Sequence, residues 1–162
     1  MFLRVYPEFA RSLQRRIQRV RCGGIDKGSL TMVDFKPVIL CVDDEEVPLT
    51  LRKLVLEKAG YDVVTASSAP KALEIVFSRH IDLVLSDHLM PGSTGTELTR
   101  QNKSKLPELP VILLSGVNEV PADAGCADLF LSKVVGPVIM CENVAMILEG
   151  AQVRNREKRR SS

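Results

Sequence analysis

Three acidic side chains in this sequence follow short apolar segments. Asp43 and Asp44 come directly after the run VILCV, and Asp87 comes after the run LVLS, where Met90 and Pro91 then favour a loop. Apolar runs of this length are typical of strands that are buried on both faces of a parallel sheet. The carboxyl ends of such strands share one edge, where ligands bind in open α/β sheets, so we expect the carboxylates to converge there.

Neighbouring carboxylates of this kind can bind a hard cation. Oxygen-only ligands with room for water and phosphate oxygens suit Mg²⁺ better than Ca²⁺. Ser115 ends a further apolar run and Lys133 follows another, so a hydroxyl and an ammonium group would face the acids across the same edge. Both groups can bind the oxygens of a phosphoryl group. The sequence therefore predicts a site for phosphoryl chemistry that holds Mg²⁺.

Each of these signals has an ordinary structural explanation when it is taken alone. An acid pair after a strand is usually a turn or a helix cap, a Ser-Gly pair is usually a turn, and a single lysine is usually solvated. Their succession at the ends of predicted strands favours a functional site. His88, which directly follows Asp87, is expected to be a solvent-exposed loop residue without a catalytic role.

Apolar runs and helical periodicity alternate along the chain from Pro37 onward. The runs predict strands at residues 38–42, 63–66, 83–85, 111–114 and 129–131. The periodic segments predict helices at about residues 47–59, 69–79, 94–104, 119–126 and 138–150. The first of these helices would end at Gly60. Parallel neighbours need crossover connections, so the alternation predicts an α/β fold with a doubly wound, five-stranded parallel sheet in a single domain.

The charge is unevenly distributed along the 162 residues. Residues 1–30 carry seven basic and two acidic residues (+5), residues 31–150 carry ten and seventeen (−7), and residues 151–162 carry five and one (+4). We therefore expect a basic, disordered extension at 1–35, one folded domain at 36–150 and a basic C-terminal tail.

The first twenty residues also carry an apolar helical spacing, with Phe9, Leu13, Ile17 and Val20 on one face. Such a basic helix can lie on an anionic surface or resemble an organelle-targeting peptide, and translation from Met32 is a further alternative. We favour a dispensable extension. No apolar run reaches the length of a transmembrane helix, so membrane insertion is not expected. The four cysteines lack the spacing of a zinc site, which indicates reduced thiols in a cytoplasmic protein.

Residues 36–150 resemble the receiver domain of two-component response regulators. The resemblance is carried by the segments ILCVDDEE, SDHLMPGSTGTEL, ILLSG and DLFLSK. It implies a flavodoxin-like fold with the strand order 2-1-3-4-5. It also implies that Asp87 is the phosphoacceptor and that Asp43, Asp44, Asp87 and the backbone carbonyl of Leu89 hold Mg²⁺.

The resemblance further implies that Ser115 and Lys133 bind the phosphoryl oxygens and that Ser115 and Phe130 form a switch. In that family, phosphorylation draws the hydroxyl inward and lets the aromatic ring turn in, which remodels a face of the domain. Core packing is a compatible alternative for Phe130.

Two features of the sequence depart from the family pattern. Val134 follows Lys133 where the family has proline, and Lys133 comes only eighteen positions after Ser115. A non-proline cis peptide costs about 3 kcal/mol, so we expect a different loop geometry after Lys133. The short spacing predicts a truncated fourth helix.

Together these implications predict a stand-alone response-regulator receiver that acts in phosphorelay signal transduction. This phosphoprotein would accept phosphate from a sensor histidine kinase or a phosphotransfer protein and then switch its contacts with a downstream protein target. It would take part in its own phosphorylation and dephosphorylation without being an enzyme for another substrate. We expect no output domain after residue 150.

Three alternatives remain open at this point. One is a receiver-like scaffold that works without phosphorylation. Another is nucleic-acid binding through the basic ends, which the acidic body and the lack of aromatic residues in the C-terminal cluster disfavour. The third is a hydrolase with an aspartyl intermediate, but no second acid follows two residues after Asp87.

Overall fold

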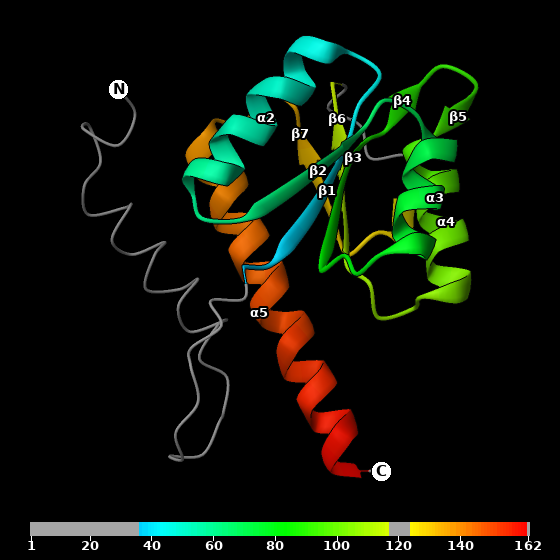
Figure 1. Ribbon diagram of the computed structural model, residues 1–162, viewed down its shortest axis with the longest axis vertical. Helices are drawn as coiled ribbons and strands as arrows, with labels where there is room; N and C mark the ends of the chain where they lie inside the picture. Colours follow the sequence, from blue (N-terminus) through cyan, green and yellow to red (C-terminus); the bar gives the residue numbers. More distant parts are fainter. Residues whose placement is uncertain (1–35, 117–123, 162) are drawn as a thin grey trace.

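Parallel strands form the central sheet of the computed structural model, which describes residues 36–116 and 124–161 (Figure 1). The strands of this sheet are β1 (Val38–Val42), β2 (Asp62–Ala66), β3 (Leu83–Asp87), β6 (Val111–Ser115) and β7 (Leu129–Ser132). Their order across the sheet is β2-β1-β3-β6-β7, and every pair of neighbours is parallel. The predicted doubly wound, flavodoxin-like fold with the strand order 2-1-3-4-5 is confirmed.

Helices cover both faces of this sheet (Figure 1). They are α2 (Glu46–Lys58), α3 (Ala69–Ser78), α4 (Gly95–Lys105) and α5 (Pro137–Ser161). One core cluster joins α2 and α5 to the sheet, and a second joins α3 and α4 to its other face. All residues of β3 and β6 are buried, so the strand that ends in Asp87 lies in the middle of the molecule.

Local sequence explains where several of these elements begin and end. Helix α4 starts with a capping box, in which the Thr94 hydroxyl accepts from the Glu97 backbone N–H and the Glu97 carboxylate accepts from the Thr94 N–H. Helix α2 ends as predicted before Gly60, whose φ of 100° is a conformation that glycine adopts without strain.

A small hairpin that the sequence did not predict follows β3. Strands β4 (Leu89–Met90) and β5 (Ser93–Thr94) are antiparallel and are joined through Pro91 and Gly92. Gly92 has a φ of 76°, which suits a tight turn after proline. The hairpin carries the chain from Asp87 directly to the start of α4.

Two predicted helices differ in the structure. The expected helix at 119–126 lies mostly outside the described residues, and its described end is a single 3₁₀ turn, η2 (Ala124–Cys126). The last helix was predicted to end near residue 150, but α5 continues to Ser161. Within the described part of the chain, no helix is both long and apolar enough to cross a bilayer.

Two aspartates fix the amino ends of strands by the same pair of hydrogen bonds. The Asp82 carboxylate accepts the Val38 N–H at 2.7 Å, while the Asp82 N–H donates to the Val38 carbonyl at 2.8 Å. Asp128 repeats this arrangement with Val111, at 2.9 Å in both directions. Asp128 also pairs with Lys103 at 2.7 Å and with Arg154 of α5 at 3.7 Å. These bonds set the register of neighbouring strands at the amino edge of the sheet.

Candidate functional site

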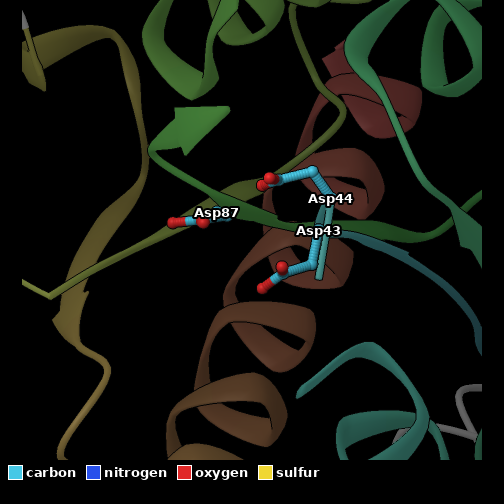
Figure 2. A group of neighbouring side chains, drawn as sticks. All are labelled: Asp43, Asp44 and Asp87. Atoms are coloured by element: carbon cyan, nitrogen blue, oxygen red, sulfur yellow. The ribbon is translucent and has the colours of Figure 1, made fainter. Parts of the chain in front are cut away.

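Three carboxylates meet at the carboxyl edge of the sheet. Asp43 and Asp44 follow β1 and Asp87 ends β3, and one oxygen from each lies within 4.8 Å of the others (Figure 2). Asp43 is 0% exposed and Asp87 is 2% exposed, whereas Asp44 is exposed. The structure therefore brings together the acidic residues that the sequence predicted to converge, with Asp44 at the solvent side.

The Asp87 carboxylate is held on both of its oxygens. Lys133 Nζ donates to Oδ2 at 2.6 Å, and the Leu89 N–H approaches Oδ1 at 3.4 Å. A Cβ at Gly95 would lie 2.4 Å from the Asp87 carbonyl oxygen, so only glycine lets α4 start this close to β3. The strand end, the hairpin and the helix start thus fix the position of Asp87.

The Asp43 carboxylate has partners from α2 and from the residue that caps this helix. The Glu45 N–H donates to Oδ1 at 2.8 Å, and the Arg52 guanidinium donates to Oδ2. Lys133 Nζ lies 4.0 Å from the same Oδ2. Sequence reasoning missed Arg52, although a signal exists, because Arg52 lies three residues after Leu49 and four before Leu56 on the face of α2 that packs on the sheet.

The predicted hydroxyl and ammonium lie on the neighbouring strands. Ser115 is 0% exposed at the end of β6, one residue beyond the partner of Asp87 in the sheet. The Lys133 N–H donates to the Ser115 carbonyl at 2.7 Å, which ties the end of β7 to the end of β6. Lys133 lies within a turn that is closed by the hydrogen bond from the Val135 N–H to the Ser132 carbonyl at 3.1 Å, and its ammonium reaches Asp87.

His88 was predicted to be an exposed loop residue, and this prediction was wrong. Its side chain is only 6% exposed, and its Nδ1 lies 3.2 Å from Oγ1 of the buried Thr96 in α4. Its ring packs edge-on against Phe130 of β7, with centroids 5.9 Å apart and planes at 64°. Residues of α4 and β7 thus cover His88, and no local pattern in the sequence predicts these contacts. Phe130, partly buried against the core, is therefore in contact with the residue next to Asp87.

Two buried thiols, Cys41 of β1 and Cys141 of α5, are kept protonated by their surroundings. Burial raises the pKa of the Cys41 thiol to about 12, while the nearby Arg52 guanidinium lowers it and the Asp43 carboxylate raises it further. Burial likewise raises the pKa of Cys141 to about 12. Neither thiol is a nucleophile near neutral pH, so the carboxylates carry the chemistry of this edge.

The donor set of the cluster suits a hard divalent cation. Every candidate ligand is a carboxylate oxygen, and the exposed Asp44 leaves an open side toward solvent. Three carboxylates with Lys133 and Arg52 leave a formal charge of −1 at the site. A divalent cation can offset this charge, so the residues present fit Mg²⁺.

Comparison with known proteins gives the family of this chain. A family model described as the response regulator receiver domain matches residues 39–144. The chain belongs to this family. The rice two-component response regulator ORR3 (Oryza sativa subsp. indica) is 33% identical over 114 residues, which cover 66% of this chain and 87% of ORR3. The transcriptional regulatory protein PhoP of Bacillus subtilis is 32% identical over 120 residues, which cover 71% of this chain and half of PhoP.

Solved receiver structures share the fold. The response regulator TrrA of Thermotoga maritima, crystallised in complex with Mg²⁺-BeF, is 31% identical and superposes with a TM-score of 0.66 over 68% of this chain and 98% of TrrA. A CheY-like receiver domain protein of Methanospirillum hungatei is 26% identical, with a TM-score of 0.70 over 74% of this chain and 99% of that protein. The match therefore spans whole receiver domains.

Proposed function

We propose that this receiver accepts a phosphoryl group on Asp87. The observation that carries the proposal is the placement of a buried carboxylate at a strand end, 2.6 Å from the Lys133 ammonium and within 4.8 Å of carboxylate oxygens of Asp43 and Asp44. A carboxylate so placed is a nucleophile with its charge partners already in position. Membership of the receiver family supports the same assignment.

In the proposed reaction, an Asp87 oxygen attacks phosphorus in line with the leaving group. A new P–O bond forms to Asp87, and the bond from phosphorus to the donor breaks, with its electron pair leaving on the donor. Lys133 stays charged and neutralises the transferred phosphoryl oxygens, to which the Ser115 hydroxyl donates. The chain takes part in this transfer onto its own Asp87. In dephosphorylation, water attacks phosphorus, the bond from phosphorus to Asp87 breaks, and inorganic phosphate leaves while the carboxylate is restored.

Mg²⁺ is the proposed cofactor. Asp43, Asp44, Asp87 and the backbone carbonyl of Leu89 would hold the ion, and its charge would help to neutralise the phosphoryl oxygens. The oxygen-only donor set supports this assignment. The complex of TrrA with Mg²⁺-BeF is a further point of support, since TrrA shares this fold.

Phosphorylation is proposed to act through Ser115 and Phe130. A phosphoryl group on Asp87 would draw the Ser115 hydroxyl toward it and let Phe130 change position. The edge-on contact between Phe130 and His88 supports such coupling, because it joins the switch residue to the neighbour of Asp87. The output would be altered binding of a downstream protein, and the phosphate would come from a histidine kinase or phosphotransfer protein in the cytoplasm.

The test is phosphorylation by a small donor. We expect wild type incubated with acetyl phosphate and Mg²⁺ to gain the mass of one phosphoryl group, as measured by intact mass spectrometry. Asp87→Asn should gain none. As a control for general damage, Asp62→Asn changes an exposed aspartate at the opposite edge of the sheet and should be phosphorylated like wild type. Equal modification of Asp87→Asn and wild type would reject Asp87 as the acceptor.

Binding of nucleic acid through the C-terminal basic residues gains no support from the structure. Arg154 pairs with Asp128, and Lys158 pairs with Glu108, so part of this charge is directed to acids of the same domain.

A further inference from the structure

Arg52 is a cation of the site that the proposed phosphoryl transfer does not use. Its side chain is only 13% exposed, and its guanidinium donates to Oδ2 of the fully buried Asp43. A guanidinium keeps its charge at any accessible pH. A permanent positive charge therefore lies on one of the proposed metal ligands.

Both oxygens of Asp43 already have donors in this arrangement. The Glu45 N–H donates to Oδ1, Arg52 donates to Oδ2, and Lys133 Nζ lies 4.0 Å from Oδ2. Asp44, by contrast, is exposed, and Asp87 is held by Lys133. A divalent cation that approaches Asp43 must share its carboxylate with Arg52 or displace the guanidinium.

We infer that Arg52 is a positioning residue that holds Asp43 by an ion pair and competes with Mg²⁺ for this carboxylate. The inference rests on the proposed metal site and adds to it a built-in competitor. Arg52 stabilises the metal-free protein, because without it the buried Asp43 carboxylate would keep only the Glu45 N–H and the Lys133 ammonium, whose Nζ lies 4.0 Å away. The same charge weakens Mg²⁺ binding and leaves the site more favourable to an anionic phosphoryl group.

The inference is tested by measuring Mg²⁺ affinity directly. Isothermal titration with MgCl₂ at constant ionic strength would compare wild type with Arg52→Gln and with Arg52→Met, which keeps the apolar stem. We expect both variants to bind Mg²⁺ about tenfold more tightly than wild type, as for the loss of one repelling charge near the ion. The matched control is Lys53→Gln. This change removes the cation of the next residue in α2, whose side chain is 43% exposed. Its dissociation constant should stay within about twofold of wild type.

Thermal unfolding separates competition from a purely structural role. Without Mg²⁺, we expect both Arg52 variants to melt below wild type, because Asp43 loses its partner. Saturating Mg²⁺ should remove most of this difference in melting temperature, since the variants bind the ion more tightly than wild type and their native state gains more stability from it. A residue that only anchors α2 would give the same deficit at every Mg²⁺ concentration.

The outcomes distinguish this inference from the proposed metal site. Equal Mg²⁺ affinities in wild type and the Arg52 variants, with normal binding, would overturn the role of Arg52 and leave the metal site intact. Absence of Mg²⁺ binding in wild type and in both variants would overturn the metal site, and the inference with it. Tighter binding in both variants together with a deficit that Mg²⁺ removes would support it.

Discussion

The two edges of the sheet use aspartate in different ways. At the amino edge, the carboxylates of Asp82 and Asp128 each accept a backbone N–H of the neighbouring strand, and their own backbone N–H groups donate to the carbonyl of the same residue. At the carboxyl edge, Asp43 and Asp87 lie with Asp44 in one cluster, and side-chain cations supply most of their compensation. The same residue type therefore fixes strands at one edge and gathers negative charge at the other.

This difference has an energetic reason. A carboxylate that accepts a fixed backbone N–H stabilises the folded chain, because the donor is already in place and would otherwise be unsatisfied. Carboxylates gathered within 4.8 Å repel one another and need cations, which costs stability but prepares a site for phosphoryl chemistry. Substitutions at the amino edge should thus reduce stability, and substitutions at the carboxyl edge should mainly reduce phosphoryl transfer.

The largest expected effect at the carboxyl edge, apart from the loss of Asp87, comes from Lys133→Met. This change removes the donor that lies 2.6 Å from the acceptor carboxylate, so the rate of phosphorylation by acetyl phosphate should fall about 100-fold. The rate can be followed by intact mass against time. The free energy of unfolding should also fall, because the buried Asp87 carboxylate loses a cation, but the loss of rate should be the larger effect. A large loss of stability with an unchanged rate would contradict the functional assignment of this edge.

At the amino edge, Asp128→Ala should destabilise the protein by about 2 kcal/mol. The substitution leaves the N–H of the buried Val111 without its side-chain acceptor and removes the partner of Lys103. Urea denaturation measures this loss. Asp62→Ala is the matched control, because Asp62 begins β2 at the same edge and is exposed, and it should change stability by less than about 0.5 kcal/mol. The folded Asp128 variant should be phosphorylated at the same rate as wild type. A lower rate would contradict the assignment of stability to the amino edge and of phosphoryl transfer to the carboxyl edge.

The smallest expected effect concerns the exposed pair between Lys158 of α5 and Glu108. The hydrogen bond from Lys158 lowers the pKa of the Glu108 carboxyl, so Lys158→Gln should raise this pKa toward its usual value in an NMR titration. A carboxyl group whose pKa is lowered by folding contributes stability above its unfolded pKa, and this contribution is lost as the pH falls through the folded pKa. Any difference in melting temperature between wild type and the variant should therefore disappear at pH values below the folded pKa of Glu108. High salt should reduce the difference in pKa between wild type and the variant. An unchanged Glu108 pKa would show that α5 is not held here by this pair.

Much of the fold and part of the site follow from local sequence. The apolar runs that precede Asp43 and Asp87 identify β1 and β3, and their alternation with helical periodicity predicts a doubly wound parallel sheet, whereas the strand order was implied by the resemblance to receiver domains. Gly60 marks the end of α2 because it takes a positive φ that other residues avoid. These features depend on residues close together in the chain, where periodicity and turn chemistry act.

Other features depend on residues that meet only after folding. His88 was expected in solvent, but α4 brings Thr96 and β7 brings Phe130 into contact with it. Arg52 reaches Asp43 because α2 packs its sheet-facing side beside the end of β1. Helix α5 continues beyond residue 150, where Arg154 and Lys158 form ion pairs with acidic residues of the domain. A basic segment without an apolar period does not predict these pairs.

The sequence by itself determined the parallel sheet and the acids at its carboxyl edge, because burial and strand ends are recorded in local apolar patterns, and the order of the strands followed from the resemblance to receiver domains. Only the tertiary structure decided which charges compensate those acids and which side chains close over the residue next to Asp87. These choices depend on contacts between segments distant in the chain. Helical spacing places Arg52 on the sheet-facing side of α2 but does not identify Asp43 as its partner, and no local pattern identifies the partners of His88.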